Sequence, residues 1–556
     1  MSEKYSIGVD YGTKSARALL LNLNTGEELA VAEREYPHGV IDEVIPGVNI
    51  KLPVDWALEL TDDFLEVFVE TVSEVMRTSG VNPADVIGIG TDFTSCSILP
   101  IDENGTPLYK LERFKTHPHA YPKLWKHHAA QPEANRLNEI ASERGEDFMR
   151  YYGGKQNSEW MIPKVMQVLD EDEEVYNAAD RFIECGDYLT MELTGKLLKS
   201  SSQAGYKSSW SKRTGFPSEA FFKALDPRME HLASTKLRGD IGLIGDRVGG
   251  LKKEYADRVG LPEGVAVGVS IIDSCVSACA LGVVEAGTFL MNIGTSTCHT
   301  LLATEDKTFE GILGLVEDGI IRGFYGYETG QACVGDHFDW FVKNCVPASY
   351  HEEAKSRGLN IHKLLREKAS AQKPGESGLV ALDWWNGNRS ILVDADLTGM
   401  IVGMTLLTRP EEIYRALIEA TAYGTRVVVD NYRKNEVPIK RVLACGGIAQ
   451  KDPMMMQIYA DVINMEIGVS YSTQAPARGA AMWGAVAAGA DRGGFDSIIE
   501  ASEKLALPIT KTYSPIPENV AVYEELFAEY MRLHDYFGRG GNDVMKRLKE
   551  IKKRQS

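Results

Sequence analysis

A glycine-threonine turn between two apolar strands occurs twice in the chain, and its residue types could bind phosphate. The first turn follows a strand at residues 5–10, and the second follows a strand at residues 289–293. Such a turn presents backbone N–H groups and hydroxyls together, which suits a phosphate group. Two related copies predict two similar domains that face one nucleotide across a cleft. The residues expected to contact the nucleotide phosphates are Gly12, Thr13, Lys14, Gly294 and Thr295.

The two copies differ at the residue that ends the first strand, which is Asp10 in one and Asn292 in the other. A carboxylate at the end of an apolar strand is costly unless it has a partner. A carboxylate beside phosphate-binding groups is a usual way to hold Mg²⁺, directly or through water. We therefore predict that Asp10 holds Mg²⁺, while the second turn only cradles phosphate. The alternative is that Asp10 caps its own turn.

Asp273 is the candidate catalytic base, because it follows an apolar strand and precedes a helix of small residues. Transfer of a phosphoryl group to an alcohol needs a positioned carboxylate and little other covalent chemistry from the protein. The alternative role is that of a helix N-cap, which contributes about 1 kcal/mol. The two roles are compatible, and the sequence does not separate them.

Three further positions have residue types that suit a nucleotide or a sugar. Gly446 and Gly447 lie between a strand and a helix, where paired glycines let a purine or ribose approach the backbone, and Ala449 follows them. Glu328 lies between two glycines and could accept hydrogen bonds from sugar hydroxyls, and Lys207 could donate them. The alternative for Gly446 and Gly447 is a simple helix-entry turn. The alternatives for Glu328 and Lys207 are a surface turn and a surface lysine.

The elements that must position these residues are alternating strands and helices, which predicts an α/β protein. Strands are expected at 5–10, 16–23, 29–36 and 86–90, and a helix is expected at 55–76. Residues 110–235 are more helical and are expected to be an insertion that carries substrate specificity. The second half begins near residue 287.

Helix start signals are clear in the second half. Residues 408–411 form a capping-box pattern with a proline, which predicts a helix that runs to residue 431. Asp452 and Pro453 predict a second helix at 454–464. An Ala- and Gly-rich helix at 475–489 should pack closely against a neighbour. The tail from residue 517 to the end reads as amphipathic helices with a basic, solvated end.

Composition excludes several function classes. The chain has 556 residues and a net charge of −19, which favours several domains and argues against a nucleic-acid binder. The eight cysteines include no Cys-x-x-Cys pair, so neither zinc nor a redox motif is indicated, and buried free thiols are expected. We find neither a signal peptide nor a membrane-length apolar run, which predicts a cytoplasmic protein without membrane contact.

These motifs, in this order, resemble the FGGY carbohydrate kinases over roughly residues 4–490. The most specific match is the second signature region of the family, at residues 399–404 and 412–419. The first signature region is degenerate, because it keeps Lys164 but lacks the expected tryptophan near Gln167. Asp452 stands where many relatives have asparagine.

The resemblance implies the fold and the domains. The expected fold is α/β, with two ribonuclease-H-like domains of the actin, sugar kinase and heat-shock ATPase superfamily and a nucleotide and substrate cleft between them. Residues 1–286 would form the sugar-binding domain, with the catalytic base and the insertion. Residues 287–495 would form the nucleotide-binding domain, and residues 496–556 a helical tail packed on it.

Within the family, three segments look most like L-ribulokinases, namely residues 92–96, 121–131 and 205–210. That similarity implies ATP-dependent phosphorylation of the 5-hydroxyl of L-ribulose, in L-arabinose catabolism, with Mg²⁺ as cofactor. It also implies that Cys96 (through its backbone), Lys207, Asp273 and Glu328 contact the ketopentose, with Asp273 as general base.

Two alternative functions remain open. One is a kinase for another ketopentose, such as D-ribulose or D-xylulose. The other is a nucleotide-switched binding module like the chaperone and actin members of the superfamily, which would need no base at Asp273. The sequence leaves open whether the chain forms a homodimer.

Overall fold

The computed structural model describes residues 3–470, 472 and 474–555, and its first half is built on a mixed sheet. The strands of this sheet are β1 (Tyr5–Tyr11), β2 (Ser15–Asn22), β3 (Glu28–Glu35), β6 (Val86–Phe93), β11 (Arg247–Gly250), β12 (Ala266–Gly268) and β13 (Ile271–Ile272). They lie in the order β11-β12-β6-β1-β2-β3, and β13 also pairs with β6. The strands expected at 5–10, 16–23, 29–36 and 86–90 are confirmed with small changes at their ends.

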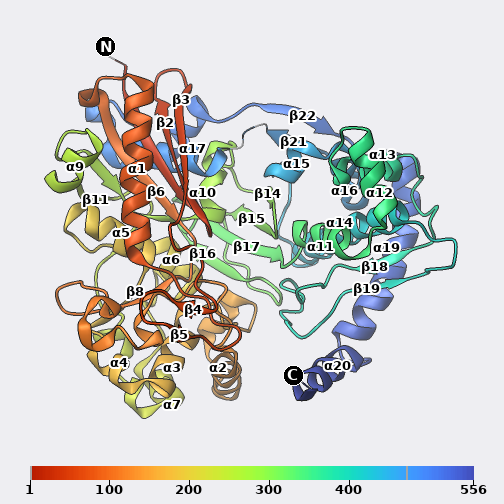
Figure 1. The fold of residues 1–556 in the computed structure, drawn as a ribbon, viewed down its shortest axis with the longest axis horizontal. Coiled ribbons are helices and arrows are strands. Elements are labelled where there is room, and N and C mark those ends of the chain that lie inside the picture. Colours follow the sequence, from red (N-terminus) through yellow and green to blue (C-terminus); the bar gives the residue numbers. More distant parts are fainter. Residues whose placement is uncertain (1–2, 471, 473, 556) are drawn as a thin grey trace.

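A second mixed sheet lies in the other half of the chain. Its strands are β14 (Thr288–Ile293), β15 (Thr297–Ala303), β16 (Gly314–Glu317), β17 (Tyr325–Gln331), β20 (Arg441–Cys445), β21 (Ile467–Ser470) and β22 (Ile509–Tyr513), in the order β16-β17-β15-β14-β20-β21-β22. β14 is antiparallel to β15 and parallel to β20, just as β1 is antiparallel to β2 and parallel to β6. The repeated hairpin in the sequence is therefore a repeated structural unit. Figure 1 shows the first sheet at the left and β14, β15 and β17 near the centre.

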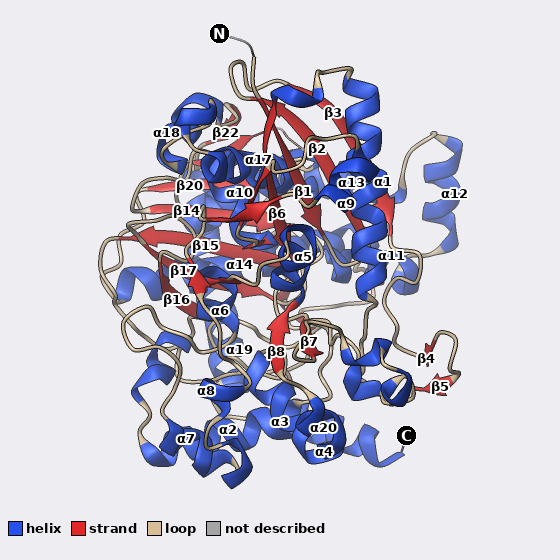
Figure 2. Ribbon diagram, turned by 90° about the vertical axis from the view of Figure 1, so that its left-hand side faces the viewer, coloured by secondary structure: helices blue, strands red, loops and turns tan. Residues whose placement is uncertain are grey.

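Most helices of the insertion lie below the first sheet (Figures 1 and 2), whereas α5 packs against that sheet. They are α2 (Gln131–Arg144), α3 (Met161–Glu171), α4 (Glu173–Ala178), α5 (Cys185–Thr194), α6 (Ser201–Lys207), α7 (Glu219–Leu225) and α8 (Leu232–Thr235). Most of them share an apolar core with the loops of residues 41–121, separate from the cores that line the two sheets. The helical character expected of residues 110–235 is confirmed.

The remaining helices include those that cover the sheets, and the tail adds both helices and a strand. They are α1 (Thr61–Ser79), α9 (Lys253–Val259), α10 (Asp273–Ala280), α11 (Gly335–Cys345), α12 (Ala348–Ser356), α13 (Ile361–Ser370), α14 (Pro410–Lys434), α15 (Gly447–Lys451), α16 (Pro453–Ile463), α17 (Ala475–Ala488), α18 (Ile498–Leu505), α19 (Pro517–Gly538) and α20 (Val544–Gln555). Short ladders form between β4 (Val44–Ile45) and β5 (Ile50–Lys51), β7 (Ile98–Ile101) and β8 (Arg181–Glu184), β9 (Lys199–Ser200) and β10 (Ile241–Gly242), and β18 (Val380–Leu382) and β19 (Met400–Val402).

Two predicted helix starts are wrong. α1 begins at Thr61 rather than near residue 55, because Asp55 has a left-handed φ of 68° and cannot continue a right-handed helix. The capping box of α14 is shifted by one residue from the predicted pattern. Its N-cap is Arg409, whose backbone N–H donates to the Glu412 carboxylate at 2.6 Å, and the helix runs on to Lys434. The predicted start of α16 at Asp452 and Pro453 is confirmed.

The predicted close packing of the Ala- and Gly-rich helix is confirmed, and its neighbour is the first sheet. α17 lies across β1 and β6 and also contacts α10. A Cβ atom added at Gly8 would overlap the carbonyl oxygen of Ala477, and one added at Gly90 would overlap that of Ala480. A helix late in the chain thus completes the core of the first half.

A second joint between the halves is built around Tyr206 of α6. Its ring lies in a slot formed by Gly314, Gly319 and Gly326, and its hydroxyl donates to the Gly326 carbonyl at 2.7 Å. These glycines lie on or between β16 and β17. Because α6 belongs to the insertion, this aromatic contact ties the insertion to the second sheet.

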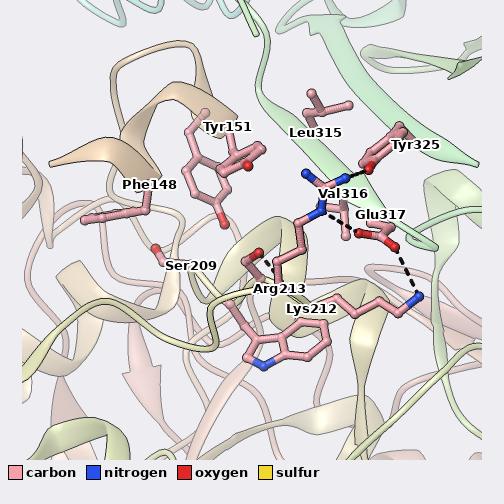
Figure 3. A pocket seen from close by; sticks show the side chains of 12 residues that line it. Phe148, Tyr151, Ser209, Lys212, Arg213, Leu315, Val316, Glu317 and Tyr325 are labelled. Carbon is pink, nitrogen blue, oxygen red and sulfur yellow. Dashed lines mark hydrogen bonds and ion pairs between the residues drawn. The ribbon is translucent and has the colours of Figure 1, made fainter. Parts of the chain in front are cut away.

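Charged residues close over the same joint, and Figure 3 shows Lys212 and Arg213 directed toward Glu317. Lys212 donates to Glu317 at 3.2 Å and to Asp318 at 2.5 Å, and Arg213 pairs with Asp306 at 2.9 Å. The small pocket beside them has a volume of only about 30 Å³. This volume holds about one water molecule, and the charged groups around it are already paired. We therefore interpret the pocket as part of the contact between the halves and not as a ligand site.

Among the residues described, no helix is long and apolar enough to cross a membrane. The expectation of buried free thiols is confirmed for Cys96, Cys185, Cys275, Cys279, Cys333 and Cys445, whereas Cys298 is partly exposed and Cys345 is exposed.

Candidate active site

A single cleft of about 1040 Å³ brings together most of the predicted site residues, although they come from both halves of the chain. Those that line it are Asp10, Thr13, Lys14, Cys96, Lys207, Asp273, Gly294, Thr295 and Glu328. Gly12, Gly446, Gly447 and Ala449 are not part of the lining. Both glycine-threonine turns therefore face one space, and the candidate sugar residues share that space with them.

The two turns use their glycine amides internally. The Gly12 N–H donates to the Ser15 carbonyl at 3.0 Å, and the Gly294 N–H donates to the Ser296 carbonyl at 2.9 Å. In this conformation these two amides shape the turns rather than face a ligand. The phosphate-facing groups are then expected to be later residues of each turn. Lys14 brings the positive charge that an anionic nucleotide needs.

Three carboxylates lie at adjoining strand ends beside the first turn. Asp10 on β1 is in register with Asp92 on β6, and β13, which also pairs with β6, ends one residue before Asp273. Arg17 pairs with Asp10 at 3.5 Å. Asp92 is fully buried, and apart from a hydrogen bond that it can share with Asp10 its carboxylate has no partner among the described residues. This concentration of negative charge is costly without a cation or a shared proton.

Burial is the main reason that the pKa values of these carboxyl groups are raised. It raises the pKa of Asp273 to about 7, with a further contribution from the negative charge of Asp10. Burial likewise raises the pKa of Asp10, and it raises that of Asp92 well above its ordinary value. Asp273 lines the cleft and accepts the Ser274 N–H at 2.7 Å, but it is the first residue of α10 and not its N-cap, which is Ile272. A carboxylate with a pKa near 7 is suited to accept a proton at neutral pH.

The same carboxylates decide how well the site suits Mg²⁺. Within the described part of the chain, no group of three or more His, Cys, Asp or Glu side chains is arranged to enclose a metal ion. Mg²⁺ usually takes one or two carboxylates and completes its shell with water and substrate phosphates. Asp10, at the cleft surface and beside the buried carboxyl group of Asp92, fits that mode of binding.

The candidate sugar end contains a buried ion pair that joins the two halves. The Lys207 ammonium of α6 donates to the Glu328 carboxylate of β17 at 2.8 Å. Burial alone would lower the pKa of Lys207, but the carboxylate of Glu328 outweighs it and raises that pKa. Cys298 donates to the other oxygen of Glu328 at 3.8 Å. Lys207 therefore stays charged and can serve as a donor to sugar oxygens.

Cys96 has an unusual backbone that a buried lysine supports. Its φ is 66°, which is uncommon for a residue other than glycine. Lys164 of α3 donates to the Cys96 carbonyl at 2.6 Å and to the Leu124 carbonyl at 2.8 Å. The lysine kept from the first signature region thus fixes the turn that was predicted to contact the sugar.

Residues 125–128 belong to one of the segments that look most like L-ribulokinases. They lie between the phosphate end and the sugar end of the cleft. Trp125 donates through Nε1 to the Thr13 hydroxyl at 3.2 Å, and His128 lines the cleft. His127 forms a 2.8 Å hydrogen bond with Gln167. Gln167 lies in the part of the first signature region where a tryptophan is expected. Its side-chain amide is the hydrogen-bond partner of the buried His127.

The turn predicted for the adenosine lies just beyond the cleft. Gly446 has a φ of 96°, and an added Cβ there would overlap the carbonyl oxygen of Ile293, one residue before Gly294. Nothing lies within 4 Å of a Cβ added at Gly447, whereas Ala449 is buried. The turn is thus placed next to the second phosphate turn, with open space at Gly447.

Sequence reasoning missed several residues of the cleft. Glu159, Arg389 and Asn386 line it, and Asp92 lies beneath it. Two signals in the sequence were available. One is the run of polar residues at 386–390, which comes shortly after an apolar strand, and the other is Asp92, a second acid near a strand end. Neither signal shows by itself which side chains turn toward a common space.

Comparison with known proteins agrees with the two-part organisation. The N-terminal domain model of the FGGY family of carbohydrate kinases matches residues 5–280, and its C-terminal domain model matches residues 289–488. A "Ribulokinase" of Halalkalibacterium halodurans is 56% identical over 99% of this chain and 98% of its own length. A "Ribulokinase" of Geobacillus thermodenitrificans is 55% identical with the same coverage of both chains.

The solved structures show the fold. The ligand-bound xylulose kinase of Lactobacillus acidophilus superimposes with a TM-score of 0.77 at 19% identity, over 96% of this chain and 98% of that one. The predicted α/β fold of two ribonuclease-H-like domains is therefore confirmed, and so is the family resemblance. On the strength of two domain models that together span most of its length, the chain belongs to the FGGY family of carbohydrate kinases.

Proposed function

We propose that this protein transfers the γ-phosphoryl group of ATP to the 5-hydroxyl of L-ribulose. The observation that supports it most is the single cleft lined by both glycine-threonine turns, by Asp273 and by the Lys207–Glu328 pair. The relatives that are 55–56% identical over nearly the whole chain carry the name ribulokinase, which points to ribulose as the acceptor.

In the proposed reaction Asp273 accepts the proton of the 5-hydroxyl as its oxygen attacks the γ-phosphorus. The new P–O bond forms while the bond from the γ-phosphorus to the bridging β,γ-oxygen breaks, so ADP leaves with the electron pair. Thr13, Lys14 and Thr295 stabilise the transferring group from opposite sides of the cleft. Cys96, Lys207 and Glu328 hold the sugar.

Mg²⁺ bound near Asp10, directly or through water, would neutralise charge on the β- and γ-phosphates. Gly446, Gly447 and Ala449 are proposed to receive the adenosine side of ATP, next to the second turn. Gly12 and Gly294 are proposed to act through the shape that they give to the turns. The proposed division at residue 286 separates the two sheets, although α17 packs on the first sheet. The proposed boundary at residue 495 does not, because β22 of the tail pairs with β21 in the second sheet, so the tail is not only helical.

The base assignment is tested by Asp273→Asn, which keeps the size of the side chain and removes its basicity. General-base catalysis contributes roughly 100- to 10,000-fold to the rate, so we expect kcat to fall by about that factor with the KM for L-ribulose nearly unchanged. Glu43→Gln, another acid of the cleft lining, is the matched control. A kcat close to that of the unmodified protein in Asp273→Asn would contradict the assignment.

The substrate assignment is tested by the rate of ADP formation with L-ribulose, D-ribulose and D-xylulose. We expect the highest kcat/KM with L-ribulose. A strong preference for D-xylulose would favour another ketopentose kinase, and ATP turnover that ignores every sugar would favour a nucleotide-switched module.

A further inference from the structure

A second ion pair crosses the cleft, and it has no role in the reaction proposed above. Nη2 of Arg389 lies 3.4 Å from Oε1 of Glu159, and both residues line the cleft. Glu159 belongs to the turn before α3 in the insertion, whereas Arg389 belongs to the loop between β18 and β19. The side chains are 17% and 20% exposed, so they are largely removed from bulk water.

The pair lies at the sugar end of the cleft. A Cβ atom added at Gly330 would lie 3.6 Å from Cδ of Arg389, which places the arginine stem along β17, two residues beyond Glu328. Glu328 and Cys96 are among the groups that act electrostatically on Arg389, and Lys207 and His128 are among those that act on Glu159. The surroundings of the pair are therefore the residues proposed to hold the sugar.

The guanidinium keeps donors available for a ligand. Of the hydrogen bonds found among the described residues, its only one is the single contact to Glu159. An arginine has five N–H donors and no acceptor, so most of its donors remain unused here. Carbonyl and hydroxyl oxygens of a sugar are suitable acceptors, and the lowered pKa of Glu159 keeps that carboxylate charged against the arginine.

The direction of the substrate follows from its chemistry. The 5-hydroxyl must lie at Asp273, near the phosphate turns, so the C1–C2 end of an extended ketopentose points toward the far side of the sugar residues. We propose that Arg389 determines specificity by donating hydrogen bonds to the oxygens at the C1–C2 end of the ketopentose, and that Glu159 positions the guanidinium from the opposite half. The inference rests on the proposed function.

The test replaces Arg389 by Met, which keeps the length and removes the donors, and by Lys, which keeps the charge. A hydrogen bond from a charged group contributes enough to change affinity by roughly 10- to 100-fold. We expect Arg389→Met to raise the KM for L-ribulose by about that factor, with kcat within about threefold and the KM for ATP unchanged. Arg389→Lys should recover part of the loss.

A second measurement asks whether the contact is to the ketose end. L-arabitol has the L-ribulose skeleton with an alcohol in place of the C2 carbonyl. We expect the ratio of kcat/KM for L-ribulose to that for L-arabitol to fall toward one in Arg389→Met. Glu159→Gln should raise the KM for L-ribulose by a smaller factor, and its effect should largely vanish when combined with Arg389→Met.

Arg136→Met is the matched control, because Arg136 is paired with Asp170 at 2.6 Å and lines neither the cleft nor the joint. It should leave the KM for L-ribulose unchanged. An unchanged KM for L-ribulose in Arg389→Met, or a raised KM for ATP instead, would overturn the inference. If Arg389→Met does not fold, the KM and the ketose-to-alditol ratio of Arg389→Lys decide. If the unmodified protein phosphorylates no ketopentose, the proposed function itself fails, which the same assay distinguishes.

Discussion

At the scale of single residues, the site depends on which carboxylates are charged. Asp10, Asp92 and Asp273 lie at adjoining strand ends, and burial raises the pKa of each. Groups with the same chemistry thereby acquire different roles. Asp273, with a pKa of about 7, can exchange a proton at neutral pH, whereas Asp10 pairs with Arg17 and faces the cleft, where a cation is proposed.

The titration of Asp273 predicts the pH dependence of the reaction. Its basic form is lost as the pH falls through about 7, so kcat/KM for L-ribulose should fall about tenfold per pH unit below pH 7 and level off above it. Initial rates at saturating ATP between pH 5 and 9 measure this limb. Asp42→Asn, which changes another acid of the cleft, should leave the limb in place. A limb near pH 4 would contradict the role of Asp273.

At the scale of elements, the contact between α17 and the first sheet is set by backbone rather than by side chains. Gly8, Gly88 and Gly90 each lie against a carbonyl oxygen of α17, so the helix approaches the strands without intervening side chains. Asp10 and Asp92 are the last residues but one of β1 and β6. The distance between helix and sheet is therefore coupled to the position of the phosphate end of the cleft.

Gly90→Ala tests that contact. The added methyl group would overlap the Ala480 carbonyl, and overpacking a close-packed interface costs about 1–3 kcal/mol or more. The free energy of unfolding, measured by urea denaturation, should fall by at least this amount. Gly80→Ala is the control, because Gly80 has a φ of 65° but no atom within 4 Å of an added Cβ. It should cost about 1 kcal/mol from the left-handed backbone alone, and a loss in Gly90→Ala no larger than that in Gly80→Ala would contradict the argument.

Much of this arrangement was predictable from the sequence, because it depends on local patterns. The sequence predicted the alternation of strands and helices, the two glycine-threonine turns and the N-cap at Asp452. The start of α1 was not, because a left-handed φ at Asp55 overrides an apolar periodicity that continues through Trp56. Glu159 and Arg389 could not be paired from the sequence, since their contact depends on how two distant loops meet across the cleft.

At the scale of the whole molecule, the insertion and the second sheet meet at Tyr206, next to the ion pair of Lys207 with Glu328. The tyrosine ring fills a slot lined by glycines, and the residue after it points its ammonium into the cleft. The geometry of the sugar site is thus set by a packing contact between the halves rather than within one of them.

Tyr206→Ala and Tyr206→Phe separate the packing of this joint from its hydrogen bond. Loss of a buried aromatic ring costs about 3–5 kcal/mol, whereas loss of one hydrogen bond costs about 1 kcal/mol. We expect Tyr206→Ala to lower the free energy of unfolding by the larger amount and to raise the KM for L-ribulose, because Lys207 loses its support. Tyr206→Phe should show only the smaller loss of stability. Equal effects of the two variants, measured by urea denaturation, would contradict this account.

The late position of α17 along the chain has a consequence for biosynthesis. Strands β1 and β6 leave the ribosome long before residues 475–488 are made, with their glycine-rich face uncovered. At roughly 5–20 residues per second, the first sheet must wait on the order of half a minute for the helix that completes its core. During translation the N-terminal half therefore exposes apolar surface that the finished protein buries under α17.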